Sequence, residues 1–142
     1  MSRKFKQGNT VSLITGKSAG TSVKDIPTDE TLLFNFKHLD RQQGQMFEHW
    51  EKNEMLARML WRFHGHSSTP MRSIFNDKFK IYGSFPAKSD FTHPAHVPPD
   101  AQWASMHIQG KECVCGHILK NIFYVVFLDC EHRFYISELK NT

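Results

Sequence analysis

The sequence predicts an α+β fold in which a strand and two helices precede an antiparallel three-stranded meander. Apolar side chains recur at helical spacing between about residues 40 and 77, whereas from Trp103 onward they follow the two-residue period of strands. A Pro-rich connector over residues 80–100 separates the two patterns. The change of period at this connector indicates helices packed on a sheet that is built mainly from the last third of the chain.

The first half of the chain supplies one strand and the helices. Residues 31–39 alternate in the manner of a strand. Asp40 is expected to cap a helix that runs to about His64, either as one long helix or as two short ones broken near Asn53. A Ser-Thr-Pro sequence predicts a shorter helix over about residues 70–77. The apolar stripe of the first helical region is expected in the core: Met46, Phe47, Trp50, Met55, Leu56, Met59, Leu60 and Phe63.

The last third of the chain predicts three strands over Trp103–Leu139, joined by tight turns at Gly110-Lys111 and Lys120-Asn121. Two-residue turns fix the expected strand pairing: Gln109 with Glu112, His107 with Val114, Leu119 with Ile122, and Cys113 with Leu128. Alternation then puts one set of thiols and imidazoles on the face that the helices cover: Cys113, Cys115, His117, Cys130 and His132.

These thiols and imidazoles are ligands that zinc prefers, so a zinc site is an alternative to simple core packing of these residues. Side chains two residues apart along a strand lie about 7 Å from one another, which is too far to share one zinc ion without a bulge. A free cysteine among Val, Leu and Met is more often a small buried apolar residue. We therefore expect no bound metal and no cofactor.

The 142-residue length indicates one domain. Residues 1–30, rich in Ser, Thr, Gly and Lys, are expected to form an N-terminal arm, and residues 31–142 to form the single α+β domain. No apolar run reaches the roughly 18 residues that span a bilayer, and the basic start is not followed by an apolar segment, so neither a membrane partner nor a secretory signal is expected. The odd count of three cysteines predicts a reducing compartment, the cytoplasm.

Residues that carry chemistry gather where the last predicted strand ends. Asp129, His132, Arg133 and Tyr135 follow one another closely there, and His107 lies on the first strand of the predicted meander. A rigid strand that ends in His, Arg and Tyr is suited to acid–base chemistry on a phosphate. The net charge of +4 is compatible with a polyanionic partner.

The order of a strand, two helices and three antiparallel strands ending in His, Arg and Tyr resembles the RelE/ParE superfamily of toxin–antitoxin toxins, over about residues 31–139. The resemblance implies a metal-independent endoribonuclease that cuts mRNA, in many members on the ribosome, by attack of a ribose 2′-OH on the adjacent phosphate. It implies His132 as general base or acid, Arg133 as phosphate clamp, and Tyr135 as a base-stacking or proton-donating residue. His107 completes the candidate catalytic set, and four lysines are expected to contact RNA: Lys111, Lys120, Lys80 and Lys88.

The middle strand departs from the family, because it reads Glu112-Cys-Val-Cys-Gly-His117 and lacks the usual basic residues. Two other readings therefore stay open. One is a non-catalytic interaction module, such as a toxin-fold binding protein or a phage-defence component. The other is an enzyme of different chemistry, in which His107 works with Asp129 or Glu112 on a small ligand. The expected partners are RNA, including ribosome-bound RNA, and an antitoxin or other protein.

Overall fold

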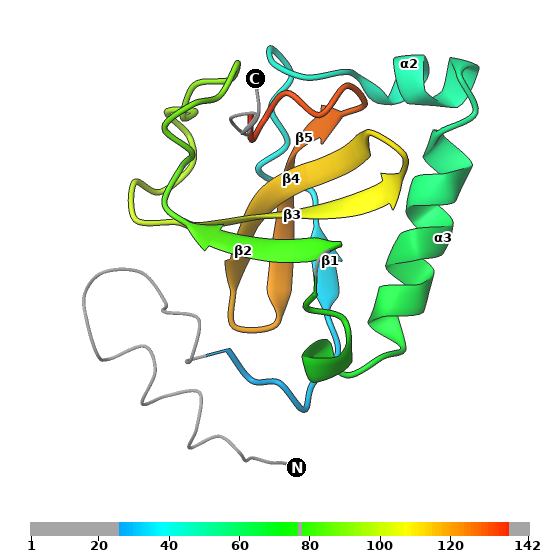
Figure 1. Ribbon diagram of the computed structural model, residues 1–142, viewed down its shortest axis with the longest axis vertical. Coiled ribbons are helices and arrows are strands. Elements are labelled where there is room, and N and C mark those ends of the chain that lie inside the picture. The colour runs from blue at the N-terminus through cyan, green and yellow to red at the C-terminus, as the bar shows by residue number, and fades with distance from the viewer. Residues whose placement is uncertain (1–25, 77, 137–142) are drawn as a thin grey trace, which may run out of the picture.

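The computed structural model describes residues 26–76 and 78–136. It has the predicted α+β fold, with a strand, two helices and then an antiparallel β-meander in a five-stranded mixed sheet of order β1-β5-β4-β3-β2 (Figure 1). The strands are β1 (Leu33–Asn35), β2 (Phe79–Gly83), β3 (Gln102–Gln109), β4 (Glu112–Leu119) and β5 (Ile122–Asp129), and the helices are α2 (Phe47–Lys52), α3 (Leu56–Ser67) and the 3-10 turn η2 (Met71–Ser73).

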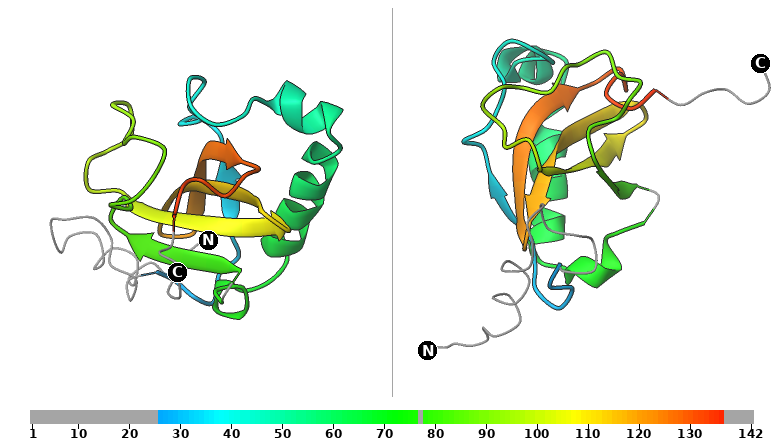
Figure 2. Two further views of the ribbon diagram at one scale, coloured as in Figure 1. Left: turned by 45° about the horizontal axis from the view of Figure 1, so that its top comes forward. Right: turned by 90° about the vertical axis from the view of Figure 1, so that its left-hand side faces the viewer.

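The sheet is strongly twisted and lies between two unlike layers. In Figure 1, β2 and β3 run horizontally while β1 and β5 run vertically, and α3 lies beside the sheet at the right. The connector after β2 loops over the other face, as the rotated views of Figure 2 show. β1 pairs with β5 in parallel, and the other neighbouring strands are antiparallel.

The helical layer buries the larger apolar cluster. Trp50, Met59 and Phe63 are buried against sheet residues that include Met106 and Phe123. This confirms the predicted core stripe at its centre, although Leu60 is half exposed.

The connector layer buries a second, aromatic cluster. The ring of Phe91 stacks on Phe127 with centroids 4.5 Å apart, and Phe85 meets Trp103 edge-on at 4.9 Å. Phe134, from the segment after β5, is buried in the same cluster. The connector is thus held down by its aromatic side chains in spite of its prolines.

The predicted helix start at Asp40 was wrong. The carboxylate of Asp40 accepts the backbone N–H groups of Gln42 and Gln43, at 2.7 and 3.2 Å, in a bend that does not continue as a helix. Gly44 follows with φ 81°, where a Cβ would lie 2.8 Å from the carbonyl oxygen of Leu128. The chain must pass β5 closely before α2 can begin.

The break expected near Asn53 is present, since α2 ends at Lys52 and Glu54 has φ 61° before α3 begins. The helix expected over residues 70–77 is reduced to the single 3-10 turn η2. The first strand is also shorter than expected, because the side chain of Asn35 accepts the N–H of Lys37 at 2.8 Å and turns the chain.

The strand β2 was not predicted, because all of its residues except Phe79 were expected in the Pro-rich connector. It forms an edge of the sheet and pairs with β3, with Phe79 opposite Met106 and Ile81 opposite Ala104. The last strand, in turn, ends at Asp129, earlier than expected, and residues 130–136 leave the sheet as a loop.

Both predicted turns are confirmed, and so are the pairs that flank them, Gln109 with Glu112 and Leu119 with Ile122. The two inner pairs were wrong because each hairpin contains a bulge. His107 lies opposite Cys113, and Cys113 lies opposite Asp129. The bulges reverse the faces expected for β4, so that Cys113 and Cys115 pack in the connector cluster and Val114 packs under the helices.

Most of the expected arm, residues 1–25, lies outside the described residues. Residues 26–30 pack against the turn η2: Ile26 is buried, and the carbonyl of Glu30 accepts the N–H of Met71 at 2.9 Å. Neither α2 nor α3, the α-helices of the described part of the chain, has the length and apolar composition needed to cross a membrane.

Candidate functional site

A cavity of about 750 Å³ lies along β2, where β3 and the loop after β5 approach it. Its lining combines two imidazoles, an ammonium group and aromatic rings: Phe75, Asn76, Phe79, Lys80, Ile81, Tyr82, Ser105, His107, His132 and Tyr135. None of these ten residues carries a carboxylate. A cavity lined by cationic and hydrogen-bonding groups without a carboxylate is suited to an anionic ligand.

Two histidines face one another in this cavity. The ring centroids of His107 and His132 are 5.3 Å apart, with an angle of 39° between the rings. His107 comes from β3, where its backbone N–H donates to the carbonyl of Lys78 at 2.8 Å. Burial lowers the pKa of His107, and the neighbouring His132 lowers it further. The ring of His107 therefore favours its neutral form.

His132 is positioned by a short loop that the end of β5 organises. Asp129 is buried, and its carboxylate accepts the backbone N–H groups of Arg133 and Phe134, each at 2.9 Å. His132 itself has φ 61°, in the left-handed region that non-glycine residues rarely adopt. The buried side chain of Phe134 anchors the far side of this loop. His132 is thus held in a loop that is anchored at Asp129 on one side and at Phe134 on the other.

Cys113 is buried next to the two histidines, on the side away from the cavity. Its Sγ is 3.8 Å from the Nδ1 of His107, and one ligand atom from each of Cys113, His107 and His132 lies within 4.8 Å of the others. The bulge at Ile108 produces this grouping, because in the unbulged register His107 would face Val114. Burial raises the pKa of the Cys113 thiol to about 12, and nearby Asp129 adds to this effect.

Two tyrosines form one wall of the cavity. The rings of Tyr82 and Tyr135 stack with centroids 4.6 Å apart and 10° between their planes. The hydroxyl of Tyr82 is 2.9 Å from the hydroxyl of Ser105, and burial raises the pKa of Tyr82. A flat aromatic surface beside a cationic cavity is the arrangement on which an unpaired base stacks.

Four of the residues expected in the site lie together here, namely His107, His132, Tyr135 and Lys80. Arg133 does not line the cavity, because its guanidinium pairs with the carboxylate of Asp90 in the connector. That pairing, with the hydrogen bond from the N–H of Asp90 to the carbonyl of Arg133 at 3.0 Å, ties the connector to the loop after β5.

The other expected lysines lie outside the cavity lining. Lys111 is in the turn between β3 and β4, and Lys120 is in the turn at the opposite end of β4. Lys88 belongs to the connector, where its carbonyl accepts the N–H of Ile136 at 3.3 Å. RNA contacts at these three positions would therefore lie outside the cavity lining.

The acid–base partners considered for His107 have other contacts. Glu112 pairs with Arg58 of α3, with 2.6 Å between the carboxylate oxygen and the guanidinium nitrogen. The carboxylate of Asp129 accepts hydrogen bonds from the backbone N–H groups of Arg133 and Phe134. The ring of His132, and neither of these two carboxylates, therefore lies next to the ring of His107 in the cavity lining.

Sequence reasoning missed two contributors, Tyr82 and Cys113. The alternation in Phe79–Gly83 was a signal for β2 and hence for Tyr82. No local signal marks the bulge that turns Cys113 toward His107, because a bulge depends on packing between strands.

Comparisons with known proteins identify no relative: no family model, no curated protein and no solved structure matches the chain.

Proposed function

We propose that the protein is a metal-independent endoribonuclease of the RelE type, with its reaction centre at His107 and His132. The observation that carries the proposal is the pair of rings, 5.3 Å apart, in a cavity that Lys80 lines and whose lining has no carboxylate among the described residues. Cleavage by a ribose 2′-OH needs a base for that hydroxyl and an acid for the leaving 5′ oxygen. Two imidazoles that both contact one phosphate supply both.

In this mechanism the neutral ring of His107 takes the 2′-OH proton as the oxygen attacks phosphorus. His132, as an imidazolium, gives a proton to the 5′ oxygen as the P–O bond breaks, leaving a 2′,3′-cyclic phosphate. The burial that lowers the pKa of His107 favours this assignment of base and acid. The ammonium group of Lys80 stabilises the negative charge that grows on the phosphate oxygens.

Substrate positioning is assigned to the stacked pair Tyr82 and Tyr135, on which a base next to the scissile phosphate would lie. Arg133 takes a different role from the phosphate clamp that the family resemblance implies. Its ion pair with Asp90 makes it a positioning residue that holds the loop of His132 against the connector.

The test is cleavage of RNA oligonucleotides and of ribosome-bound mRNA by the purified protein. The wild type is expected to produce 2′,3′-cyclic phosphate ends, and a 2′-deoxy substitution at the cut site should abolish the cut. His107→Ala and His132→Ala should each lower the rate by at least about 100-fold, whereas His64→Ala, on the exposed side of α3, should not. No cleavage by the wild type with or without ribosomes would overturn the proposal.

The alternative, a non-catalytic interaction module, is favoured by one feature of α3. Trp61 is 71% exposed and lines a groove of about 530 Å³ together with Arg62 and Ile108. The preceding residue, Leu60, is 50% exposed. Exposed apolar side chains beside a groove are typical of protein-binding surfaces. If expression of the chain arrests growth, a double variant of His107 and His132 that still arrests growth, together with a Trp61→Ala variant that does not, would favour this alternative.

A further inference from the structure

We propose that His107, Cys113 and His132 form a binding site for a single zinc ion, and that the bound ion holds the enzyme in an inactive form. The second half of the inference rests on the proposed function, since it concerns the same two imidazoles. The first half rests only on the arrangement of the three side chains. It departs from our expectation of no metal, which weighed Cys113 and His132 together with Cys115, His117 and Cys130, and not with His107.

The geometry is close to that of a tetrahedral zinc site. Zinc lies about 2.3 Å from sulfur and about 2.0–2.1 Å from imidazole nitrogen, so tetrahedral neighbours are about 3.3–3.6 Å apart. The Sγ of Cys113 and the Nδ1 of His107 are already 3.8 Å apart, and all three ligand atoms lie within 4.8 Å of one another. Small side-chain rotations would close the remaining gap.

The three ligands are held by the sheet and by the loop that Asp129 organises. His107 and Cys113 are opposite residues of β3 and β4, and Cys113 is itself opposite Asp129, which sets the loop of His132. A metal site is favoured when its ligands are positioned before the ion arrives.

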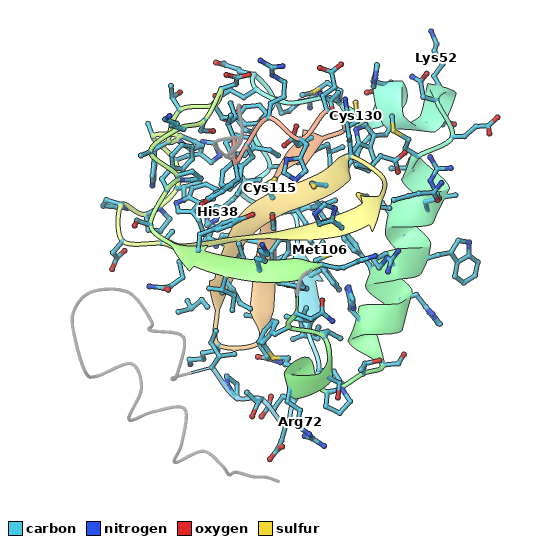
Figure 3. The ribbon with its side chains drawn as sticks, viewed as in Figure 1. His38, Lys52, Arg72, Met106, Cys115 and Cys130 are labelled. Carbon is cyan, nitrogen blue, oxygen red and sulfur yellow. The ribbon has the colours of Figure 1, made fainter. Side chains whose placement is uncertain are left out.

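The donor set selects the ion. One thiolate and two imidazoles suit zinc and not magnesium or calcium, which prefer oxygen ligands. The thiol of Cys113 gives up its proton when it coordinates. The other two cysteines do not complete the site (Figure 3). Cys115 lies two residues further along β4, where its Sγ contacts the carboxylate of Asp129. The Sγ of Cys130 lies 4.0 Å from the Nε2 of His49 in α2.

The fourth coordination position would face the cavity. His107 and His132 line the cavity, whereas Cys113 is buried behind them, so an ion held by all three lies at the cavity floor. Coordination uses the one free ring lone pair of each neutral imidazole, so zinc-bound His107 cannot accept the 2′-OH proton and zinc-bound His132 cannot become the imidazolium that protonates the leaving oxygen. Zinc therefore blocks acid–base cleavage at this site.

Binding is tested with the metal alone. Chelator-treated full-length protein is titrated with Co²⁺, and one equivalent per chain is expected to give the visible bands of tetrahedral cobalt and a thiolate-to-cobalt charge-transfer band. Zinc should displace the cobalt. Cys113→Ser should remove the charge-transfer band and weaken zinc binding by more than the ~10–100-fold that loss of an outer hydrogen bond costs.

Cys130→Ser is the matched control, since this thiol lies outside the group of three. It should retain the charge-transfer band, and circular dichroism checks that both serine variants are folded. His132→Asn provides a second ligand variant should Cys113→Ser not fold. Absence of stoichiometric binding, or a charge-transfer band that follows Cys130, would overturn the site.

The inhibitory role is tested by RNA cleavage in the presence of one equivalent of zinc. Wild-type cleavage should stop and return on addition of a chelator, and Cys113→Ser should show less inhibition relative to its own zinc-free rate. Stoichiometric binding with unchanged or faster cleavage would overturn the inhibitory role. A protein that binds zinc and never cuts RNA would refute the proposed function, and the inhibitory role with it, while the metal site stands.

Discussion

The carboxylate of Asp129 accepts the backbone N–H of Arg133 at 2.9 Å on each of its two oxygens. One of these oxygens also accepts the N–H of Phe134 at 2.9 Å. The last residue of β5 therefore closes the loop that carries His132 into the cavity. This makes the reaction centre dependent on a buried side chain that touches no substrate in our proposal.

Asp129→Asn is expected to lower the free energy of unfolding by about 1–3 kcal/mol, because the NH2 that replaces one oxygen faces the N–H of Arg133 and the remaining hydrogen bonds lose the carboxylate charge. Denaturant titration measures this change. Asp90→Asn is the matched control, since it removes the partially exposed ion pair with Arg133 and should cost less than about 1 kcal/mol. Equal losses for the two variants would contradict the role assigned to Asp129.

Gly116→Ala is expected to be among the most damaging single substitutions in the sheet. A Cβ at Gly116 would lie 1.8 Å from the carbonyl oxygen of Tyr124, and backbone cannot move aside at low cost as a flexible side chain can. We expect a loss of more than about 3 kcal/mol or failure to fold. Gly65→Ala, inside α3 with nothing within 4 Å of the new Cβ, should instead stabilise the protein by up to ~1 kcal/mol. Thermal unfolding of both variants tests the contrast.

The stability of the protein is expected to decrease at acidic pH, because two histidines that are neutral in the folded state, His38 and His117, become protonated. The Nδ1 of His38 lies 3.0 Å from the Nε2 of His117, so one ring donates and the other accepts. Burial lowers the pKa of His117 to about 4, with further lowering by His38 and His93, and burial also lowers the pKa of His38, with Lys37 and His96 adding to it. The ring of Tyr124 stacks on both, and Trp103 of β3 completes the surroundings of His117.

Because the folded pKa of His117 lies below the unfolded value of about 6.5, the unfolded chain binds more protons between these values. Stability from His117 is complete above about pH 6.5 and is lost as the pH falls toward 4, by about 3 kcal/mol in all. His66, whose pKa burial also lowers to about 4, acts in the same direction. Denaturant unfolding of wild type and His117→Gln across this range measures the effect. An unchanged pH slope in the variant would show that His117 is not responsible.

Features set by neighbouring residues were predictable from the sequence. The turns at Gly110-Lys111 and Lys120-Asn121 and the burial of Trp50 follow from local turn chemistry and from helical periodicity. His107 and His132 were candidates because residue type and strand position alone suggested them.

Features set by distant residues were not predictable in this way. The bulge that places His107 opposite Cys113 depends on how β3 and β4 pack, and the partner of Arg133 lies 43 residues earlier, at Asp90. The strand β2 was hidden because its five residues run directly into the Pro-rich connector. Pairing with β3, and not propensity, defines that strand.

The roles of Lys80 and Arg133 can be separated by one pair of variants. Lys80→Gln should lower the rate of RNA cleavage by about 10-fold or more, because it removes a positive charge from the cavity in which negative charge grows on the phosphate. Arg133→Gln should change the rate by only a few-fold, since its guanidinium pairs with Asp90 outside the cavity lining. Single-turnover rates at saturating protein separate these effects on the chemical step from effects on RNA binding. If Arg133→Gln gives the larger loss, the arginine leaves Asp90 to clamp the phosphate, and the assignment of that role to Lys80 is wrong.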